Sequence, residues 1–423
     1  MRINLAALSN TLAQQGPVIL LESQSREHPW SQRSYVAARP KAEIKAYGRQ
    51  IHISGEEGQQ CFDANPWEAL RIFREQHDGW LFGYLGYDLK NHTEQLRSQN
   101  PDAIEAPDLY FMVPEFILEQ DRVTLQGGMI KGDLLTIDKR HAFSGSRARF
   151  KVRDLAPQLS VDEYLEGIRE AQRAIADGDF YEINLSHQLR GKFSGSSLAL
   201  YQRMKKVGPV PFGAYLRTPD CTVCCQSPER FLRREAGTVC SQPIKGTSQR
   251  GKDEQEDHLL KEALSRSAKE RAENLMIVDL VRNDLSRIAE KGSVTVTRLF
   301  DIETFGTVHQ MVSTIKAKAG DKDPVGILQA CFPMGSMTGA PKISVMEAIE
   351  RIEKYRRGIY SGAIGYIKPD GDFDFNVVIR TAIIKNNELF YAVGGAITGD
   401  SNPQAEWKET LVKAEALRDA VDS

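Results

Sequence analysis

The sequence predicts an α+β fold in which antiparallel strands form sheets and helices lie outside them. Strand-like runs, bounded by turn residues, recur along the whole chain. Segments with apolar residues at helical spacing punctuate these runs. Short connections such as Lys385-Asn-Asn387 are typical of hairpins, which join antiparallel neighbours. Together these observations indicate antiparallel sheets with outer helices.

Residues 1–150 are predicted to form an N-terminal, sheet-rich subdomain. Its expected strands are residues 17–23, 80–88, 109–118 and 122–130. The first of these reads as a buried strand that ends in a polar loop. From about residue 131 to 157, mixed polar and basic residues are typical of a connector.

Residues 155–423 form the second predicted part. The order of a helix followed by a strand recurs there. Helices are expected at residues 161–177, 253–264, 269–288, 342–351 and from about 403 onward. Strands are expected at residues 180–189, 212–216, 222–226, 359–367, 373–384 and 389–396.

The composition is that of an ordinary globular chain of two or three domains, with 423 residues, 41% of them hydrophobic and 26% charged. The net charge of −2 gives no global field that would attract nucleic acid or an anionic membrane, so we expect neither as a partner. The six cysteines follow no disulfide framework, no secretory leader is evident, and no apolar run has the length of a membrane helix. These features predict a cytoplasmic protein whose clustered cysteines, 221, 224 and 225, pack in a core.

The last predicted helix carries charged residues on one side. Glu406, Glu409 and Lys413 are spaced i, i+3 and i+7, so two carboxylates and one ammonium project together. Such a face is most often only a solvated surface. The apolar stripe of this helix is predicted at residues 407, 411, 414, 417 and 421.

A second pair of carboxylates, Glu270 and Glu273, opens the helix predicted at residues 269–288. Ser267 and Glu270 fit a capping box, which gives Glu270 a purely structural alternative, whereas Glu273 has none. Four carboxylates on two helix faces, with no Cys or His at ligand spacing nearby, suit a hard cation with oxygen ligands. Mg²⁺ fits best if an anionic substrate completes its shell.

Five motifs follow one another along the chain. They are KERAENLMIVDLVRND (269–284), MGSMTGAPK (334–342), YSGAIG (360–365), GGA (394–396) and EWKET (406–410). Together they resemble the chorismate-utilising enzymes, which include the synthase subunits for anthranilate and aminodeoxychorismate and the isochorismate and salicylate synthases. The resemblance implies two large antiparallel sheets packed face to face, with the active site at one edge. It also implies that residues 155–423 are a chorismate-binding catalytic domain.

The resemblance implies two catalytic residues. Glu229 matches the general acid that protonates the departing ring hydroxyl of chorismate, although an ion pair with a neighbouring arginine is the simpler interpretation of the residues alone. A carboxyl with that task must stay protonated near neutral pH, which burial can arrange. Lys245, in Gln242-Pro-Ile-Lys-Gly-Thr247, matches the lysine of the branch that forms aminodeoxychorismate, whereas anthranilate-forming members carry a small residue. Desolvation beside Mg²⁺ would lower its pKa from about 10.4 and free the amine as a nucleophile.

Glu182 is a second discriminating position. Isochorismate and salicylate synthases resemble this region but place Lys there, where it activates water, and amine-adding members usually carry Gln. A carboxylate cannot replace that positive charge toward a dianionic substrate, so addition of water is disfavoured. Two interpretations of Glu182 remain open, a base toward ammonium or a residue at the rim of the site.

The other implied site residues hold Mg²⁺ and the two carboxylates of chorismate. Glu273 and Glu409 match the metal-binding positions, with Glu270 and Glu406 in an outer, water-mediated role. The implied substrate-binding residues are Gly246, Thr247, His309, Ser336, Tyr360, Arg380, Gly394, Gly395, Ala396 and Lys413. Near the N-terminus, Glu22 and Ser23 resemble part of a tryptophan pocket of the anthranilate branch, although a plain strand end explains them equally well.

The resemblance therefore implies a synthase that aminates chorismate with ammonia to 4-amino-4-deoxychorismate, the precursor of p-aminobenzoate and folate, through a covalent lysine intermediate. No cysteine lies in a nucleophile elbow, so a separate glutamine amidotransferase subunit is expected to supply ammonia and a downstream lyase to aromatise the product. The alternatives are anthranilate synthase component I, disfavoured by Lys245, and a catalytically silent regulatory protein that binds chorismate or tryptophan. The joint presence of the acid, the lysine and the four carboxylates disfavours the second.

Overall fold

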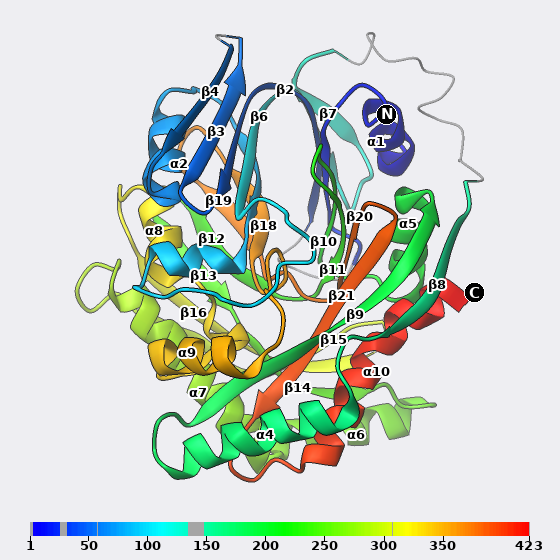
Figure 1. Ribbon diagram of the computed structural model, residues 1–423, viewed down its shortest axis with the longest axis vertical. Coiled ribbons are helices and arrows are strands. Elements are labelled where there is room, and N and C mark those ends of the chain that lie inside the picture. Colours follow the sequence, from blue (N-terminus) through cyan, green and yellow to red (C-terminus); the bar gives the residue numbers. More distant parts are fainter. Residues whose placement is uncertain (1–2, 26–31, 57, 134–147, 307, 423) are drawn as a thin grey trace.

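The computed structural model describes residues 3–25, 32–56, 58–133, 148–306 and 308–422. Within these ranges every strand pairing is antiparallel, and helices flank the strands (Figure 1). The predicted α+β class is confirmed.

The strands form two layers. One layer contains β2 (Arg33–Tyr47), β3 (Gln50–Gly55), β4 (Gly58–Asp63), β5 (Leu81–Leu85), β6 (Leu109–Asp121), β7 (Gly127–Lys131), β12 (Arg230–Glu235), β13 (Thr238–Gln242), β14 (Ile244–Gln249), β15 (Thr295–Thr304), β16 (Val308–Lys318), β18 (Ala363–Ile367) and β19 (Phe373–Asn376). The other contains β1 (Val18–Glu22), β8 (Phe150–Pro157), β9 (Glu182–Gly195), β10 (Phe212–Arg217), β11 (Thr222–Ser227), β17 (Gly339–Ala340), β20 (Thr381–Lys385) and β21 (Glu388–Ile397). Pairing between β1 and β2 makes the two layers one continuous hydrogen-bonded network.

Alternate residues along a strand belong to different cores, an inner core between the two layers and an outer core beneath the helices. On β10, Ala214 and Leu216 belong to a fully buried cluster that also contains Phe82 of β5 and Ile364 of β18 from the opposite layer. The intervening residue, Tyr215, belongs to a different cluster, beneath outer helices. This period of two is expected for strands buried on both faces, and it confirms that the layers pack face to face.

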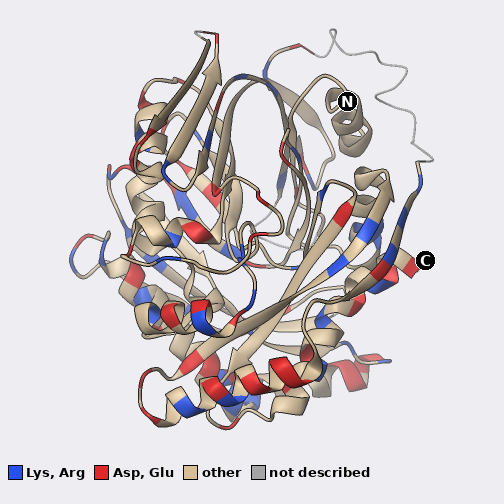
Figure 2. Ribbon diagram, viewed as in Figure 1, with Lys and Arg blue, Asp and Glu red and all other residues tan. Residues whose placement is uncertain are grey.

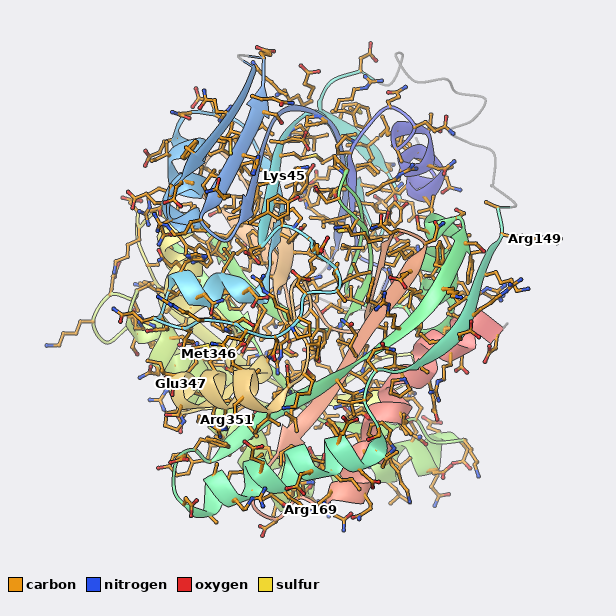
Figure 3. All side chains as sticks on the ribbon, viewed as in Figure 1. Lys45, Arg149, Arg169, Met346, Glu347 and Arg351 are labelled. Carbon is orange, nitrogen blue, oxygen red and sulfur yellow. The ribbon has the colours of Figure 1, made fainter. Side chains whose placement is uncertain are left out.

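The helices cover the outer faces. The β2–β6 layer is covered by α2 (Pro66–Glu75), α7 (Ala268–Ser286) and α8 (Pro324–Cys331), and the β9–β21 layer by α1 (Leu5–Leu12), α5 (Ser197–Val207) and α10 (Pro403–Asp422). α6 (Glu254–Arg266) packs on β14 and β15. At the end of β9, α4 (Val161–Ala176) packs against α9 (Lys342–Ile352), and Arg351, labelled in Figure 3, pairs with Glu170 at 2.8 Å.

Strands from the N-terminal part of the chain pair with strands from later parts. β1 pairs with β10, and β5 lies between β6 and β18. The division at residues 150–155 stays a prediction. In the structure, residues before and after that point share the same layers and the same inner core.

The strand predicted at residues 373–384 is two strands. β19 ends at Asn376 and β20 begins at Thr381, because the segment between them includes Arg380 in the left-handed backbone region, with φ of 51°. The hairpin predicted at residues 385–387 is confirmed, with both Asn386 and Asn387 at positive φ, as a two-residue turn requires.

Three further expectations can be compared with the structure. The buried stripe of α10 is Glu406, Thr410, Ala414, Leu417 and Ala420. The predicted stripe is therefore confirmed at residues 414 and 417 and wrong at 407, 411 and 421, which are only half-buried. The predicted connector includes β8, and residues 134–147 lie outside the described ranges. The cysteines at 221, 224 and 225 are buried and unbridged, as predicted.

Charge is mixed over the fold. Figure 2 shows Lys and Arg interspersed with Asp and Glu on the helices and strands of both halves, which agrees with the net charge of −2. Within the described ranges, no helix combines the length and the apolar character needed to cross a lipid bilayer.

We expect Phe82→Ala to lower the free energy of unfolding by about 3 to 5 kcal/mol, because the ring is fully buried between the layers and its loss leaves a cavity. Urea unfolding followed by circular dichroism measures this. The control is Phe62→Ala, whose ring is 39% exposed on β4 and whose loss should change the free energy by less than about 1 kcal/mol. Equal effects of the two substitutions would contradict the two-layer core.

Candidate active site

Ten segments contribute to the candidate site. The predicted residues lie on β9, β14, β16 and β21, at the turn after β11, on a 3₁₀ turn at Gly335–Met337, in the segments after α9 and before β20, and on α7 and α10. Figure 1 shows α7, α10, β9, β14 and β21 meeting in the lower half of the molecule. Residues more than 200 positions apart in the chain therefore come together.

β9 presents a row of polar side chains to the site. Glu182, Asn184 and Ser186 alternate with Ile183 and Leu185, which pack in the apolar core under α4 and α9. Glu182 contacts Lys245, and the Asn184 amide donates to the carbonyl of Ser336 at 3.4 Å. Asn184 and Ser186 were not predicted as site residues, although their period-two spacing from Glu182 is a signal that could have found them.

Glu229 is buried at the turn between β11 and β12, with 5% of its surface exposed. Burial raises the pKa of its carboxyl to about 7, although the Ser336 hydroxyl, which donates to it at 2.7 Å, and the charge of Lys245 act in the opposite direction. The neighbouring Arg230 pairs with Asp374 instead. The simpler interpretation, an ion pair between Glu229 and its neighbour, is wrong.

Lys245 Nζ lies 2.7 Å from Glu182 Oε1, and the side chains of the pair are 11% and 2% exposed. Burial disfavours the ammonium, but the carboxylate of Glu182, with those of Glu273 and Glu229, outweighs it and raises the pKa of Lys245. Desolvation thus acts in the expected direction, but in the protein by itself the carboxylates outweigh it, and the effect of a neighbouring Mg²⁺ on this pKa stays a prediction. The amine becomes a nucleophile only after a proton leaves it.

Asn274 fixes the backbone that carries Lys245. Its side-chain amide donates to the carbonyls of Lys245 and Met311, at 3.4 and 3.3 Å, and its oxygen accepts from the Ser313 hydroxyl at 2.5 Å. The residue follows Glu273 in the first motif but carried no distinguishing spacing of its own. Only the folded contacts between α7, β14 and β16 reveal it.

The α7 carboxylates face β14 and Lys245. A Cβ atom added at Gly246, whose φ is 91°, would lie 3.0 Å from Glu270 Oε2, so the glycine admits that carboxylate. Burial raises the pKa of Glu273, and the nearby carboxylates of Glu182 and Glu270 add to the shift, although Lys245 and Lys269 oppose it. Ser267 caps this helix through the N–H of Glu270, at 3.3 Å.

The α10 carboxylates converge on β21. A Cβ atom added at Gly395 would lie 3.5 Å from Glu406 Oε2, 3.6 Å from Glu409 Oε1 and 3.7 Å from Lys413 Nζ. Glu406 is buried and accepts from Ser401 at 2.9 Å, whereas Glu409 is 52% exposed and pairs with Lys413 at 2.7 Å. The predicted common face of Glu406, Glu409 and Lys413 is thus present.

These four carboxylates have the donor chemistry of a magnesium site. Burial raises the pKa values of Glu273 and Glu406, and repulsion from Glu270 and Glu409 respectively raises them further, a penalty that a bound cation would relieve. Burial acts to raise the pKa of Glu409, but the charges of Lys413, Lys245 and Lys269 outweigh it and lower that pKa. Lys245 and Lys269 also oppose the raised pKa of Glu273 on α7. Within the described ranges, no three acidic, His or Cys side chains lie close enough together to hold an ion by themselves. Such a site would need oxygen ligands from outside the chain.

Arg380 and Tyr360 supply the complementary charge and hydrogen bonding. The left-handed backbone at Arg380 lets its carbonyl accept from Gln226, at 3.1 Å, while the nearby Val377 N–H donates to the Glu229 carbonyl at 3.0 Å. Burial lowers the pKa of the Arg380 guanidinium, and within the described chain no carboxylate forms an ion pair with it. Burial raises the pKa of Tyr360 to about 12, so its hydroxyl remains a donor.

The remaining predicted residues divide into two groups. Gly394, Gly395 and Ala396 on β21 pair with the polar stretch of β9, and Lys413 donates to the Gly394 carbonyl at 2.8 Å. His309 and Thr247 lie further along β16 and β14. Both ring nitrogens of His309 are engaged, with Thr304 and Asp257 at 2.9 Å, and Thr247 is exposed.

A buried ion pair behind β9 positions the site and was not predicted. Arg357 and Glu353 lie 2.7 Å apart and are each 1% exposed. Arg357 donates to the carbonyls of Asn184 and Met337, at 2.8 and 2.7 Å, and Glu353 accepts from Ser186 N–H at 2.8 Å. The pair therefore ties β9 to the 3₁₀ turn that carries Ser336.

Glu22 and Ser23 border a different cavity. This cavity, of about 320 Å³, is also lined by Tyr35, Phe212 and Tyr366. Glu22 accepts from Tyr201 and Lys205, at 3.0 and 2.5 Å, and Ser23 N–H donates to the Ser34 hydroxyl at 3.0 Å. The two residues of the predicted tryptophan pocket thus lie together, away from the Lys245–Glu229 site.

Comparison with known proteins identifies the family. The family model for chorismate binding enzymes matches residues 16–419. The chain belongs to the chorismate binding enzyme family. The crystal structure of anthranilate synthase component I from Streptococcus pneumoniae TIGR4 superposes with a TM-score of 0.80 at 28% identity, over 92% of this chain and 93% of that one.

Two relatives illustrate the range of chain lengths within the chorismate binding enzymes. Aminodeoxychorismate synthase of Streptomyces griseus is 40% identical over 82% of this chain, and the chain spans 50% of that relative's length. Aminodeoxychorismate synthase component 1 of Escherichia coli (strain K12) is 32% identical over 94% of this chain and 92% of its own length.

We predict that Glu229→Gln stabilises the fold increasingly as the pH rises. Between its unfolded pKa of 4.5 and its folded pKa of about 7, the folded carboxyl keeps a proton that the unfolded one has lost, so its contribution to stability declines across this window. The amide does not titrate. The difference between the two free energies of unfolding should be small near about pH 4 and reach on the order of 3 kcal/mol near about pH 8. Urea unfolding at both pH values measures it, and parallel curves would contradict the raised pKa.

Proposed function

We propose that the protein aminates chorismate to 4-amino-4-deoxychorismate. The observation that carries this proposal is the contact between Lys245 and Glu182 next to Glu229, whose pKa of about 7 keeps it a proton donor near neutral pH. An amine nucleophile and a protonated acid in one buried pocket are what expulsion of a ring hydroxyl requires. The 40% identity to a protein named aminodeoxychorismate synthase supports the same reaction.

The anionic substrate would be held from two sides. Arg380, desolvated and without a carboxylate partner in the described chain, would bind one carboxylate in bidentate fashion, and Tyr360 would donate to it. Backbone groups of Gly394, Gly395 and Ala396 and the ammonium of Lys413 would lie along the same strand. Gly246, Thr247 and His309 are proposed to border the ring at the far end of β14 and β16.

Glu273 and Glu409 would hold Mg²⁺ together with the ring carboxylate of the substrate, with Glu270 and Glu406 in an outer role. The ion would neutralise the substrate carboxylate and polarise the ring toward attack.

The proposed covalent step begins when Lys245 passes one proton to Glu182. The Lys245 amine then forms a bond to the ring carbon next to the carboxylate-bearing carbon. The ring double bonds shift, the carbon–hydroxyl bond breaks, and the hydroxyl leaves as water with the proton of Glu229. Ammonia bonds to the former hydroxyl carbon as the ring double bonds shift back and the bond to lysine breaks. The lysine recovers its proton from Glu182, and the new ammonium group returns a proton to Glu229. The net reaction consumes chorismate and ammonia and releases water.

Ammonia is proposed to come from a separate glutamine amidotransferase subunit or from solution, and a separate lyase to convert the product into p-aminobenzoate. The component 1 designation of the E. coli relative, which matches this chain along 92% of its length, favours a two-subunit enzyme. A cytoplasmic location agrees with the unbridged cysteines. The cavity at Glu22 and Ser23 is proposed to hold tryptophan between its aromatic walls.

The product distinguishes this proposal from its alternatives. We expect the purified chain, incubated with chorismate, Mg²⁺ and an ammonium salt at mildly alkaline pH, to yield p-aminobenzoate after a lyase is added. Chromatography with mass detection identifies the product, and a parallel reaction with a chelator is the metal control. Anthranilate formed without the lyase would favour the anthranilate synthase alternative. Unchanged chorismate would favour a non-catalytic binding protein.

We expect Lys245→Ala to lower kcat for aminodeoxychorismate by at least about 100-fold, or to shift the product toward anthranilate, because the nucleophile is lost. The matched control is Lys192→Ala, which removes an exposed lysine from β9 and should leave kcat within about twofold. An undiminished rate in Lys245→Ala would exclude the covalent role while leaving amination itself intact.

A further inference from the structure

His187 lies on β9 and joins this strand to α10. The residue is fully buried, and its Nε2 lies 2.9 Å from the Thr410 hydroxyl, which donates in turn to the carbonyl of Trp407 at 2.8 Å. Its ring stacks on the ring of Trp407, with the centroids 4.9 Å apart and the planes at 28°. Trp407 and Thr410 each directly follow one of the α10 carboxylates, Glu406 and Glu409. One side chain of the strand therefore contacts the turn of α10 that carries both carboxylates.

The hydrogen bonds determine which ring nitrogen of His187 carries the proton. The Thr410 hydroxyl has one hydrogen, which it donates to the Trp407 carbonyl, so its oxygen accepts from His187 Nε2. Burial lowers the pKa of His187 to about 4, so the ring is neutral at physiological pH and holds one proton. That proton lies on Nε2, and Nδ1 is left as an acceptor.

A packing role alone does not explain a histidine at this position. The residues two positions away on the same face of β9 are Leu185 and Leu189, and both are buried in apolar clusters. His187 Nδ1 is buried there and has no hydrogen-bond partner in the described chain, which is costly. An apolar side chain would avoid this cost. The histidine is therefore explained by its other nitrogen, which holds Thr410.

β21, which pairs with β9, makes a second contact with the same turn. Glu406 and Glu409 approach the position that a Cβ atom would take at Gly395 of β21, to 3.5 and 3.6 Å. The glycine admits the helix close to the sheet, whereas His187 fixes the rotation of the turn about the helix axis. Glu406, Glu409 and Thr410 are spaced i, i+3 and i+4, on one side of the helix. A rotation at Thr410 would therefore move both carboxylates together.

We propose that His187 is a positioning residue for the metal-binding carboxylates of α10 and acts through Thr410. This inference rests on the Mg²⁺ site of the proposed function and specifies what holds one half of that site. The opposite face of β9 presents Asn184 and Ser186 to the substrate site. The strand therefore fixes the α10 carboxylates relative to the substrate, and His187 is the link between them. Loss of the link should weaken metal binding although every metal ligand is still present.

The test is the affinity for Mn²⁺, measured from the paramagnetic resonance signal of the free ion with chorismate present and ammonium absent. We expect His187→Leu to raise the Kd for Mn²⁺ by about tenfold, because the hydrogen bond that holds the turn is lost. Thr410→Val, which keeps the shape and removes the hydroxyl, should raise the Kd by a similar factor. The two changes together should raise it no further, because each removes the same link. His187→Gln, whose amide can donate to Thr410 in place of Nε2, should keep the Kd within about threefold of the wild-type value.

The matched control is Leu417→Ala, which removes a fully buried side chain from α10, further along the helix. It should lower the free energy of unfolding but leave the Kd for Mn²⁺ within about twofold. Equal affinities of wild-type protein and His187→Leu, or an equal loss in Leu417→Ala, would overturn the proposal, and so would wild-type protein that binds no Mn²⁺. Mn²⁺ binding that depends on His187, in a protein that yields no p-aminobenzoate, would instead exclude the amination and leave this inference intact.

Discussion

The buried contact between Lys245 and Glu182 is the constraint on which the site depends. Two nearly inaccessible charges are stable only because each neutralises the other, and removing one would leave the other desolvated and unpaired. The pair also connects β14 to β9, and so joins strands from the two layers. Asn274 on one side and the Arg357–Glu353 pair on the other hold the backbones that carry it.

Around this pair, charge is unevenly distributed. Glu229 is about half protonated near pH 7, because burial raises its pKa to about 7 although hydrogen bonds from the Ser336 hydroxyl and the Ile244 backbone act in the opposite direction. Carboxylates repel one another within each helix, Glu270 and Glu273 on α7 and Glu406 and Glu409 on α10. Arg380 lacks a counter-ion in the described chain. A cation near the carboxylates and an anion near Arg380 would each relieve a local excess. The proposed dianionic substrate with Mg²⁺ would supply both together.

Local sequence patterns predicted the features that depend on neighbouring residues alone. Helical spacing predicted α7 and the shared face of Glu406, Glu409 and Lys413, and the Asn-Asn dipeptide predicted the β20–β21 hairpin. The break before β20 escaped prediction because the backbone there is held by contacts of Arg380 with Gln226 and of Val377 with Glu229, about 150 residues away. Asn184 and Arg357 were missed for the same reason, since their roles exist only in long-range hydrogen bonds.

The pair also explains why positions 182 and 245 cannot vary independently. In the structure, Lys245 Nζ lies 2.7 Å from the carboxylate of residue 182. A lysine at position 182, as in the water-adding members that this region resembles, would place a second ammonium beside that of Lys245 in a buried pocket. One of them would have to be neutral. With Lys245 present, position 182 must therefore be neutral or anionic. The proposed nucleophilic role of Lys245 and the disfavoured addition of water thus share one electrostatic requirement.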